Sequence, residues 1–467
     1  MKNWMRLLVS MGCGLRLLHY LRDPSVWHDE GNLIVNVLRL DFAQLLGPLL
    51  WNGNGPPLFL WLERAVALAL GDSSLALRLV PMLASCGTLV LLSASAQRWL
   101  PPRGAFCAVL LIAVSDRLLW HSCEAKPYST DVFVASLLMF IVSFTDHWTT
   151  SRRIFLLMVL TPALVFLSYP ACFVCGGLWL SLLPAAWNSQ QRRDRWLHAI
   201  WAIVSTGAIV ALYFGPIRSQ RTGAMESCWV GHFPNWSKPW IVPVWSIANT
   251  VETFRYSFKP FGSFLAAVAL IGGYQFRHRR EFAWLTFLVA ALGLAWIAAC
   301  LGAYPYGGSR LEVYAAPALA MLIGAGIDPL RDGFVRRSLW GLGYPITIVI
   351  LIGLTLNTAI CAVHPWPRAD AAGAAAYVIA RRQPSEPVVT NHWEYDYYFR
   401  NCPHFFLEQQ PPATFGREWF VITAIDKRVR AELLKDVTRQ GRIIERRDFA
   451  MTTAILLDLG DAGVAQR

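Results

Sequence analysis

Residues 282–302 read FAWLTFLVAALGLAWIAACLG and contain no charged side chain. A helix needs about 20 mostly apolar residues to cross a bilayer, so this stretch predicts a transmembrane helix. The whole chain has the same character, because 55% of its 467 residues are apolar and only 15% are charged. A soluble domain is roughly 25% charged. We therefore predict an all-α polytopic membrane protein.

Ten further apolar runs predict spans, and the basic residues between them predict the topology, because cytoplasmic loops are enriched in lysine and arginine. The eleven predicted spans are residues 4–21, 78–97, 104–121, 131–146, 154–168, 171–187, 197–214, 260–276, 282–302, 311–327 and 339–361. With the N-terminus in the cytoplasm, every arginine-rich gap between spans falls on the cytoplasmic side. Residues 58–70 are apolar but short and contain Glu63 and Arg64, which predicts an interfacial helix within the first outer loop, residues 22–77.

The composition changes after residue 361. Short β-rich runs at 387–390, 419–425 and 454–459 surround one amphipathic helical stretch at 427–440. This pattern predicts a small α/β domain over residues 362–467. It follows an odd number of spans, so it should lie outside the cytoplasm, after a membrane module formed by residues 1–361.

The net charge of +12 does not predict nucleic-acid binding, because the basic residues form small clusters between spans and no basic tail or face is present. Most of the ten cysteines lie in apolar runs, where cysteine behaves as a small hydrophobic residue. Cys228 and Cys402 both fall in predicted outer segments and are candidates for a disulfide.

Three predicted outer gaps contain residues suited to chemistry. Residues 27–31 read WHDEG, residues 122–131 read SCEAKPYSTD, and residues 304–310 read YPYGGSR. The charged residues of each gap also have a purely structural explanation. Asp29 and Asp131 fit helix N-termini, and Arg310 fits an arginine that extends to the membrane surface. Together they place carboxylates, cations and aromatic rings on one face, which predicts a site at the outer surface. Transporters place such residues nearer the bilayer midplane.

The order of these motifs resembles the membrane-embedded GT-C glycosyltransferases, in particular the protein O-mannosyltransferases and the lipid A aminoarabinose transferases. The resemblance is carried by residues 27–30 (WHDE), 55–58 (GPPL), 76–79 (ALRL) and 124–128 (EAKPY), and by the run from Arg310 to Pro317. It implies a GT-C-like fold in the bacterial inner membrane. It also implies transfer of a sugar from a polyprenyl-phosphate donor to a lipid, glycan or protein acceptor outside the cytoplasm, with inversion by single displacement.

The resemblance implies a role for individual residues as well. Asp29, with Glu30 beside it, matches the catalytic carboxylate, and Asp131 or alternatively Glu124 matches a second acidic position. The candidates for binding the donor phosphate are Lys126 and Arg310, followed by Arg78, for which the alternative is an anchor of its span. The candidates for other substrate contacts are Trp27, His28, Pro57, Tyr128 and Tyr306.

Two residues depart from the family pattern. Gly55 stands where relatives often carry lysine or histidine, and Lys126 stands where arginine is usual. No cofactor is assigned, although an acidic pair can bind a divalent metal instead of acting as a base. Two further hypotheses are a transporter or flippase for a lipid-linked saccharide and a non-catalytic membrane scaffold.

Overall fold

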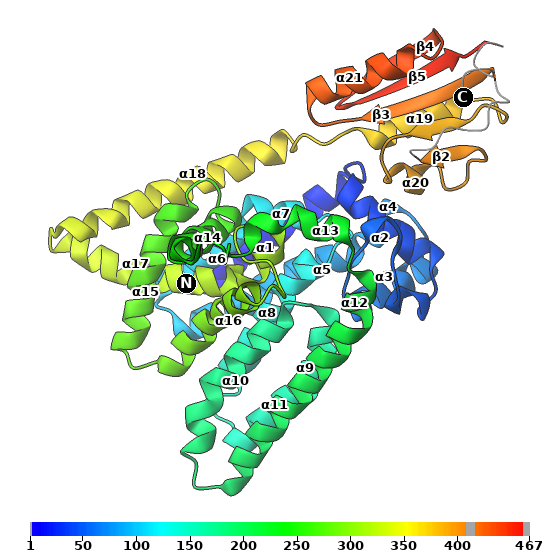
Figure 1. Cartoon of the computed structure of the whole chain (residues 1–467). Helices are drawn as coiled ribbons and strands as arrows, with labels where there is room; N and C mark the ends of the chain where they lie inside the picture. Colours follow the sequence, from blue (N-terminus) through cyan, green and yellow to red (C-terminus); the bar gives the residue numbers. More distant parts are fainter. Residues whose placement is uncertain (1, 408–415, 461–467) are drawn as a thin grey trace.

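The computed structural model describes residues 2–407 and 416–460. The described part of the chain is mostly helical and ends in a small mixed sheet (Figure 1). The long helix α18 (Gly343–Val363) leads from the helical part toward that sheet. The sheet lies on the same side of the molecule as the short helices that follow α1 (Lys2–Leu21).

A helix occupies each of the eleven stretches predicted to span the membrane. Within the described residues, six helical stretches are long and apolar enough to cross a bilayer: Leu79–Trp99, Thr150–Leu167, Arg192–Gln220, Phe282–Cys300, Arg310–Val335 and Leu339–Val363. The chain is therefore an integral multi-pass membrane protein, and the count of eleven spans and the cytoplasmic N-terminus stay predictions. The remaining predicted spans correspond to α1, α6 (Pro102–Ala113), α8 (Tyr128–Phe144), α10 (Ala171–Trp187) and α15 (Gly262–His278).

The stretch predicted as one span at residues 104–121 is two helices. Helix α6 ends at Ala113, and α7 runs over Asp116–His121. The break is stabilised by Ser115, whose hydroxyl accepts a hydrogen bond from the Leu118 N–H and donates one to the carbonyl of Ser257. The short helix α7 and the turn after it bring residues 122–127 toward the first outer loop.

The first outer loop contains a helix that the sequence indicated only as an alternative, with Asp29 near its N-terminus. Helix α2 (His28–Arg39) has Asp29 and Glu30 in its first turn, where the helix dipole favours negative charge. Its buried apolar face, which includes Leu33 and Val37, packs with that of α3 (Pro57–Leu70). Helix α3 coincides with the helix predicted at 58–70, and its placement at the membrane interface stays a prediction.

The C-terminal sheet has five strands in the order β2-β1-β3-β5-β4. The central strands are β1 (Val388–Thr390) and β3 (Arg417–Thr423), which are parallel, and β5 (Thr452–Asp458), which is antiparallel to β3. Helix α21 (Lys427–Thr438) covers one face, and α19 (Ala371–Arg381) and α20 (Tyr395–Tyr398) cover the other. The three predicted strand runs and the predicted helix are therefore present in the fold.

Two strands of the sheet were not predicted. Strand β2 (Phe405–Leu407) has only three residues, and β4 (Arg442–Phe449) is an edge strand whose side chains are mostly exposed. Neither has the alternation of apolar and polar residues by which a half-buried strand is found. No disulfide joins Cys228 to Cys402 within the described residues, so that pairing was wrong. Their sequence positions showed only that both follow predicted spans.

The C-terminal part of the chain that contains the sheet, called the sheet domain below, packs on the start of α2 through α20 and the segment before it. The hydroxyl of Tyr398 accepts a hydrogen bond from the Val26 N–H at 2.7 Å, and the Trp393 indole donates to the carbonyl of His28. The packing is close, because a β-carbon added at Gly31 would lie 2.6 Å from the α-carbon of Glu394. The segment that begins α2 is thus enclosed between the helical part and the sheet.

Candidate functional site

Asp29 is the point where three predicted site segments meet. Its Oδ2 lies 3.1 Å from Nη1 of Arg310, and its Oδ1 lies 3.5 Å from Nζ of Lys126. The hydroxyl of Tyr128 donates a hydrogen bond to Oδ2 at 3.3 Å. Asp29 comes from α2, Lys126 from the turn after α7, and Arg310 from the start of the 3₁₀ helix η6 (Arg310–Ala315). The fold therefore brings these four residues together.

The charges around Asp29 determine its ionisation. Burial alone would raise the pKa of Asp29, but the positive charges of Lys126 and Arg310 and the hydrogen bond from Tyr128 hold it below its ordinary value. Asp29 is therefore a carboxylate at neutral pH. An ionised carboxylate that is nearly buried beside two cations is suited to accept a proton or to orient a polar substrate group.

Lys126 is held by α2 as well. Its side chain is 4% exposed, and its ammonium group donates a hydrogen bond to Oδ1 of Asn32 at 2.8 Å. Burial lowers the pKa of Lys126, although the charge of Asp29 opposes this shift. Asn32 lies three residues after Asp29, so both face the lysine from one side of the helix.

Arg310 is the more accessible of the two cations. Its side chain is 32% exposed, and its Nε has no hydrogen-bond partner in the described residues. The guanidinium also lies over the rings of Tyr128 and Trp229, at 5.9 and 5.8 Å from their centres. A partly exposed guanidinium is suited to bind a phosphate.

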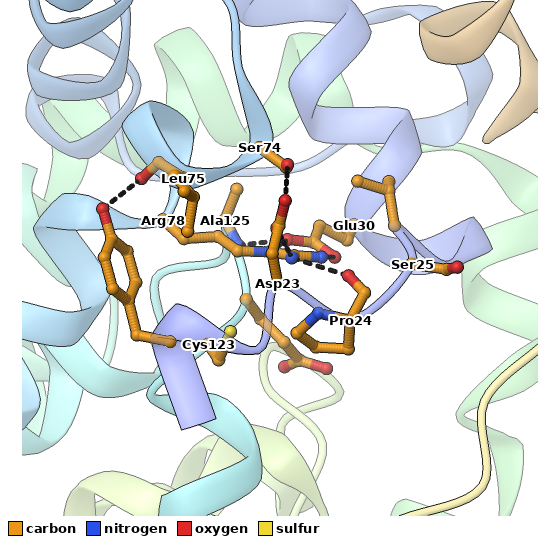
Figure 2. A network of polar contacts seen from close by, with 12 residues as sticks. Asp23, Pro24, Ser25, Glu30, Ser74, Leu75, Arg78, Cys123 and Ala125 are labelled. Carbon is orange, nitrogen blue, oxygen red and sulfur yellow. Dashed lines mark hydrogen bonds and ion pairs between the residues drawn. The ribbon is translucent and has the colours of Figure 1, made fainter. Parts of the chain in front are cut away.

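Glu30 and Arg78 face each other in a separate buried network (Figure 2). The Arg78 guanidinium donates to both carboxylate oxygens of Glu30 at 2.6 and 2.7 Å, and both side chains are fully buried. Arg78 also donates to Asp23 at 2.8 Å and to the carbonyl of Pro24 at 2.7 Å. The Ala125 N–H donates to Glu30 at 2.9 Å. The Glu30 and Arg78 side chains are therefore fully occupied by one another and by their surroundings.

Glu124 lies in a third set of contacts. The His121 ring is hydrogen-bonded to its Oε2 at 2.7 Å, and the Trp120 indole donates to its Oε1. The other ring nitrogen of His121 is 2.9 Å from the hydroxyl of Tyr256. Burial alone would raise the pKa of Glu124, but His121 and the guanidinium of Arg368 hold it below its ordinary value. Glu124 is a buried, ionised carboxylate.

Asp131 lies one turn into α8, beyond Tyr128, and is also buried. Its Oδ1 has no hydrogen-bond partner among the residues that the structure describes. Within those residues, no hydrogen bond or ion pair joins Asp131 to Asp29, Lys126 or Arg310. The two candidate catalytic aspartates thus occupy different surroundings.

The predicted substrate contacts are divided between the site and other parts of the fold. The Trp27 ring packs edge-on against His28, whose ring is 5.6 Å from that of His392 in the sheet domain. Pro57 begins α3, and the hydroxyl of Tyr306 is hydrogen-bonded to a threonine of α14 (Val242–Ser257). Trp27, His28 and Tyr128 therefore lie beside Asp29 or in its helix, whereas Pro57 and Tyr306 support neighbouring segments.

The side chains around Asp29 do not fit a divalent metal. Both carboxylate oxygens already have a cationic neighbour, Lys126 or Arg310, and a further positive ion there would be repelled. The described residues also contain no group of three or more His, Cys, Asp or Glu side chains arranged to hold a metal. The chemistry available here is that of the protein's own carboxylate, ammonium and guanidinium groups.

Several residues of the site were not found from the sequence. Asn32 would have been found if residues 28–39 had been predicted as a helix, because its spacing from Asp29 then places it on the same face. His121 and Tyr256 lie in or beside apolar runs and carry no motif. Arg368 follows α18 in a segment with no recognisable pattern, and only the fold brings it to Glu30 and Glu124.

Comparisons with known proteins agree with the fold and with part of the sequence. Residues 54–218 match the family model described as dolichyl-phosphate-mannose-protein mannosyltransferase. That match includes α3, Arg78 and residues 122–131, and it spans less than half of the chain. A comparison with curated protein sequences gives no match.

Solved structures match over much more of the chain. ArnT from Cupriavidus metallidurans bound to undecaprenyl phosphate is 12% identical, with a TM-score of 0.59 over 98% of each chain. Its apo state gives a TM-score of 0.58 over 97% of this chain and 98% of that one. The Archaeoglobus fulgidus oligosaccharyltransferase in complex with Zn and sulfate is 14% identical, with a TM-score of 0.51 over 86% of this chain and 62% of that one. The chain therefore has an ArnT-like fold and resembles the GT-C glycosyltransferases of the protein O-mannosyltransferase and ArnT type.

Proposed function

We propose that this protein is a glycosyltransferase that takes a sugar from a polyprenyl-phosphate donor. The observation that carries the proposal is the contact of Asp29 with both Lys126 and Arg310, because it places one carboxylate beside two cations. The mannosyltransferase match and the ArnT structure bound to undecaprenyl phosphate support the donor class. A transporter or flippase is not favoured by these comparisons.

Asp29 is the proposed general base. An acceptor hydroxyl or amine attacks the anomeric carbon of the donor sugar, and its proton passes to the Asp29 carboxylate. The new bond joins the acceptor to the anomeric carbon as the bond from that carbon to the phosphate oxygen breaks. The leaving group is the polyprenyl phosphate, and the proton later passes from Asp29 to water. One displacement of this kind inverts the anomeric configuration.

Lys126 and Arg310 are the proposed phosphate ligands. Negative charge accumulates on the donor phosphate as its bond to the sugar breaks, and nearby cations stabilise that charge. Arg310 offers a guanidinium whose side chain is 32% exposed, whereas Lys126 offers a point charge held by Asn32. Tyr128 positions the base through its hydrogen bond to Asp29.

Glu30, Arg78 and Glu124 receive a supporting role in this proposal. Their polar atoms are buried and bonded to one another or to neighbouring residues, which leaves Arg78 no accessible donor for a phosphate. Asp131 is the alternative acidic residue, and its Oδ1 is buried with no hydrogen-bond partner among the described residues. Trp27, His28 and Tyr128 are the proposed contacts to the sugar or the acceptor.

The proposed reaction takes place on the extracytoplasmic face of a bacterial inner membrane. The N-terminus lies in the cytoplasm, the membrane module comprises residues 1–361, and the α/β domain of residues 362–467 lies outside. The donor sugar is a hexose or a pentose. The acceptor is a lipid, a glycan or a protein of the cell envelope, and the outer location of Asp29 matches such an acceptor.

The test is a donor-consumption assay with the full chain in proteoliposomes. The probe is undecaprenyl phosphate carrying a radiolabelled sugar, supplied together with extracted envelope lipids and glycans. We expect labelled acceptor and free undecaprenyl phosphate in equal amounts. Movement of intact donor across the bilayer without free undecaprenyl phosphate would instead show a transporter.

The matched control compares two lysines. Lys126→Ala is expected to abolish release of undecaprenyl phosphate, because it removes a proposed phosphate ligand. Lys238→Ala changes an exposed lysine in the segment before α14 and is expected to retain activity. Equal activity of both variants would contradict the role of Lys126.

A further inference from the structure

Arg368 lies in the segment between α18 and α19, which joins the helical part of the chain to the sheet domain. Its side chain is only 6% exposed. Its Nη1 is 3.7 Å from Oε2 of Glu30, and its Nη2 is 3.7 Å from Oε1 of Glu124. The guanidinium carbon lies 4.1 Å from the centre of the Trp120 ring. One side chain of the connecting segment thus bridges two buried carboxylates of the helical part.

The two carboxylates differ in the positive charge that surrounds them. Glu30 is already paired with Arg78 through two hydrogen bonds. Glu124 is hydrogen-bonded to an indole and to the His121 ring, neither of which carries a permanent positive charge. A buried carboxylate without a cation is strongly destabilised. Arg368 therefore provides permanent positive charge to Glu124.

The position of Glu124 bears directly on the proposed catalytic residues. The Lys126 N–H donates to the carbonyl of Glu124 at 2.7 Å, which forms a tight turn, and the N–H of Ala125 between them donates to Glu30. Glu30 is the neighbour of Asp29 in α2. The turn that carries the lysine is therefore joined to the helix that carries the aspartate through Glu30, and Arg368 lies within ion-pair distance of both Glu30 and Glu124.

The contact of Arg368 belongs to a continuous interface with the sheet domain. The Val26 N–H donates to the hydroxyl of Tyr398, and the close approach of Gly31 to Glu394 leaves no room for a side chain. These contacts hold the residues on both sides of Asp29. The sheet domain and the connecting segment thus both contact the start of α2 and its neighbouring residues.

We propose that Arg368 is a positioning residue that couples docking of the sheet domain to the alignment of Asp29 and Lys126. The proposal rests on the glycosyltransferase function proposed above. Arg368 does not contact Asp29 in the described residues, so its effect is exerted through Glu30 and Glu124. Loss of the Arg368 contacts would therefore disturb the alignment of Asp29 and Lys126.

The kinetic test compares two substitutions at this position in the full chain. Arg368→Met keeps an apolar side chain over Trp120 but removes the charge, and we expect kcat to fall about tenfold or more, because a displacement of about 1 Å can cost 100-fold. Arg368→Lys restores the charge and should recover most of this loss. The control is Arg381→Met, since Arg381 likewise lies over a ring and pairs with a glutamate, 3.0 Å from Glu445, but is part of α19.

A double-substitution cycle separates positioning from a general loss of structure. If Arg368 acts by neutralising Glu124, then Glu124→Gln should relieve the defect of Arg368→Met, and the doubly substituted protein should be more active than the singly substituted Arg368→Met protein. If Arg368→Met does not accumulate as folded protein, the double variant should restore folding. A kcat of Arg368→Met within twofold of the unaltered chain, or a double variant no better than Arg368→Met, overturns the proposal.

The cycle also distinguishes this proposal from the proposed function. If the unaltered chain releases no undecaprenyl phosphate, the glycosyltransferase assignment fails. The same variants are then compared by thermal unfolding, which needs no substrate. A lower unfolding temperature of Arg368→Met that Glu124→Gln reverses supports the coupling. Additive effects of the two substitutions on the unfolding temperature contradict it.

Discussion

Asp29 Oδ2 lies 3.1 Å from the guanidinium of Arg310, which joins the first turn of α2 to the start of η6. The two residues belong to opposite ends of the helical part of the chain, and Lys126 completes the contact from a third segment. Removing a carboxylate and two cations from water costs desolvation free energy. Unlike the fully buried Glu30–Arg78 pair, this contact includes a partly exposed cation, Arg310, and this is why we propose the chemistry here.

The first prediction concerns the pH dependence of catalysis. Burial lowers the pKa of Lys126, so this lysine loses its positive charge at a lower pH than an exposed lysine does. We expect kcat/KM for the donor, which reports the free enzyme, to fall on the alkaline side as Lys126 is deprotonated. The pKa of Asp29 is held below its ordinary value. Protonation of Asp29 should therefore not lower kcat/KM in the mildly acidic range.

Substitution of the lysine tests the assignment of this alkaline fall. Arginine stays protonated throughout the range, so Lys126→Arg should move the alkaline limb of kcat/KM to higher pH, whatever its effect on the maximum. The comparison requires pH profiles of both proteins with the same donor. If the alkaline fall in kcat/KM occurred at the same pH in both proteins, a group other than Lys126 would be responsible for it.

The second prediction concerns the buried pair of Glu30 and Arg78. Arg78→Met leaves the carboxylate buried without its bidentate partner, and breaking such a pair costs about 3–5 kcal/mol. We expect a large fall in the temperature of thermal unfolding in detergent. The double variant with Glu30→Gln removes both charges and should recover part of the stability. An Arg78→Met protein as stable as the unaltered chain would show that the pair is not structural.

The third prediction uses the contact between Gly31 and Glu394. A β-carbon at residue 31 would lie 2.6 Å from a backbone atom of Glu394, so Gly31→Ala must push the sheet domain away from α2. We expect a loss of about 1–3 kcal/mol in stability and faster proteolysis of the connecting segment. Gly14→Ala is the control, because a β-carbon at Gly14 meets no atom within 4 Å. Identical behaviour of both variants would contradict the close packing.

The fourth prediction concerns Glu63, which is fully buried in α3 with neither carboxylate oxygen hydrogen-bonded among the described residues. Burial raises the pKa of Glu63, so the folded protein keeps a proton that the unfolded chain releases. Stability therefore falls as pH rises above the unfolded pKa, by about 1.4 kcal/mol per pH unit until the folded pKa is reached.

Substitution by glutamine removes this proton linkage. The stability gained by Glu63→Gln should increase with pH across the acidic to neutral range, as measured by thermal unfolding at a series of pH values. The exposed Glu432 in α21 provides the control, and Glu432→Gln should show no such trend. A constant difference for Glu63→Gln would mean that the carboxyl group is ionised in the folded protein.

The helices could be predicted from the sequence because membrane spans need long apolar runs, and residues 282–302 have one. Asp29, Lys126 and Arg310 could be proposed because they remain at the outer ends of predicted spans, where a charge is costly unless it is solvated or used. Their mutual contacts follow from this shared location. The helix α2 was only an alternative in the sequence, because its first turn is polar and its apolar face is short.

Other parts of the site could not be predicted for a physical reason. A basic residue at the end of a span looks the same in sequence whether it binds a phosphate or a buried carboxylate, so Arg78 was grouped with Lys126 and Arg310. The contact of Arg78 with Glu30 depends on how α2 packs against the turn at Ala125. The contacts of Arg368 depend on the path of the connecting segment, which no local sequence pattern predicts.

The rate of sugar transfer after Asp29→Asn tests whether Asp29 is the general base. Asparagine keeps the size of the side chain but cannot take the proton from the attacking hydroxyl or amine. General base catalysis increases reaction rates about 10²–10⁴-fold. We expect release of undecaprenyl phosphate to fall at least about 100-fold, with folded protein still obtained. Asp72→Asn, which changes an exposed aspartate paired with Arg400, should keep full activity. Undiminished transfer by Asp29→Asn would contradict the account.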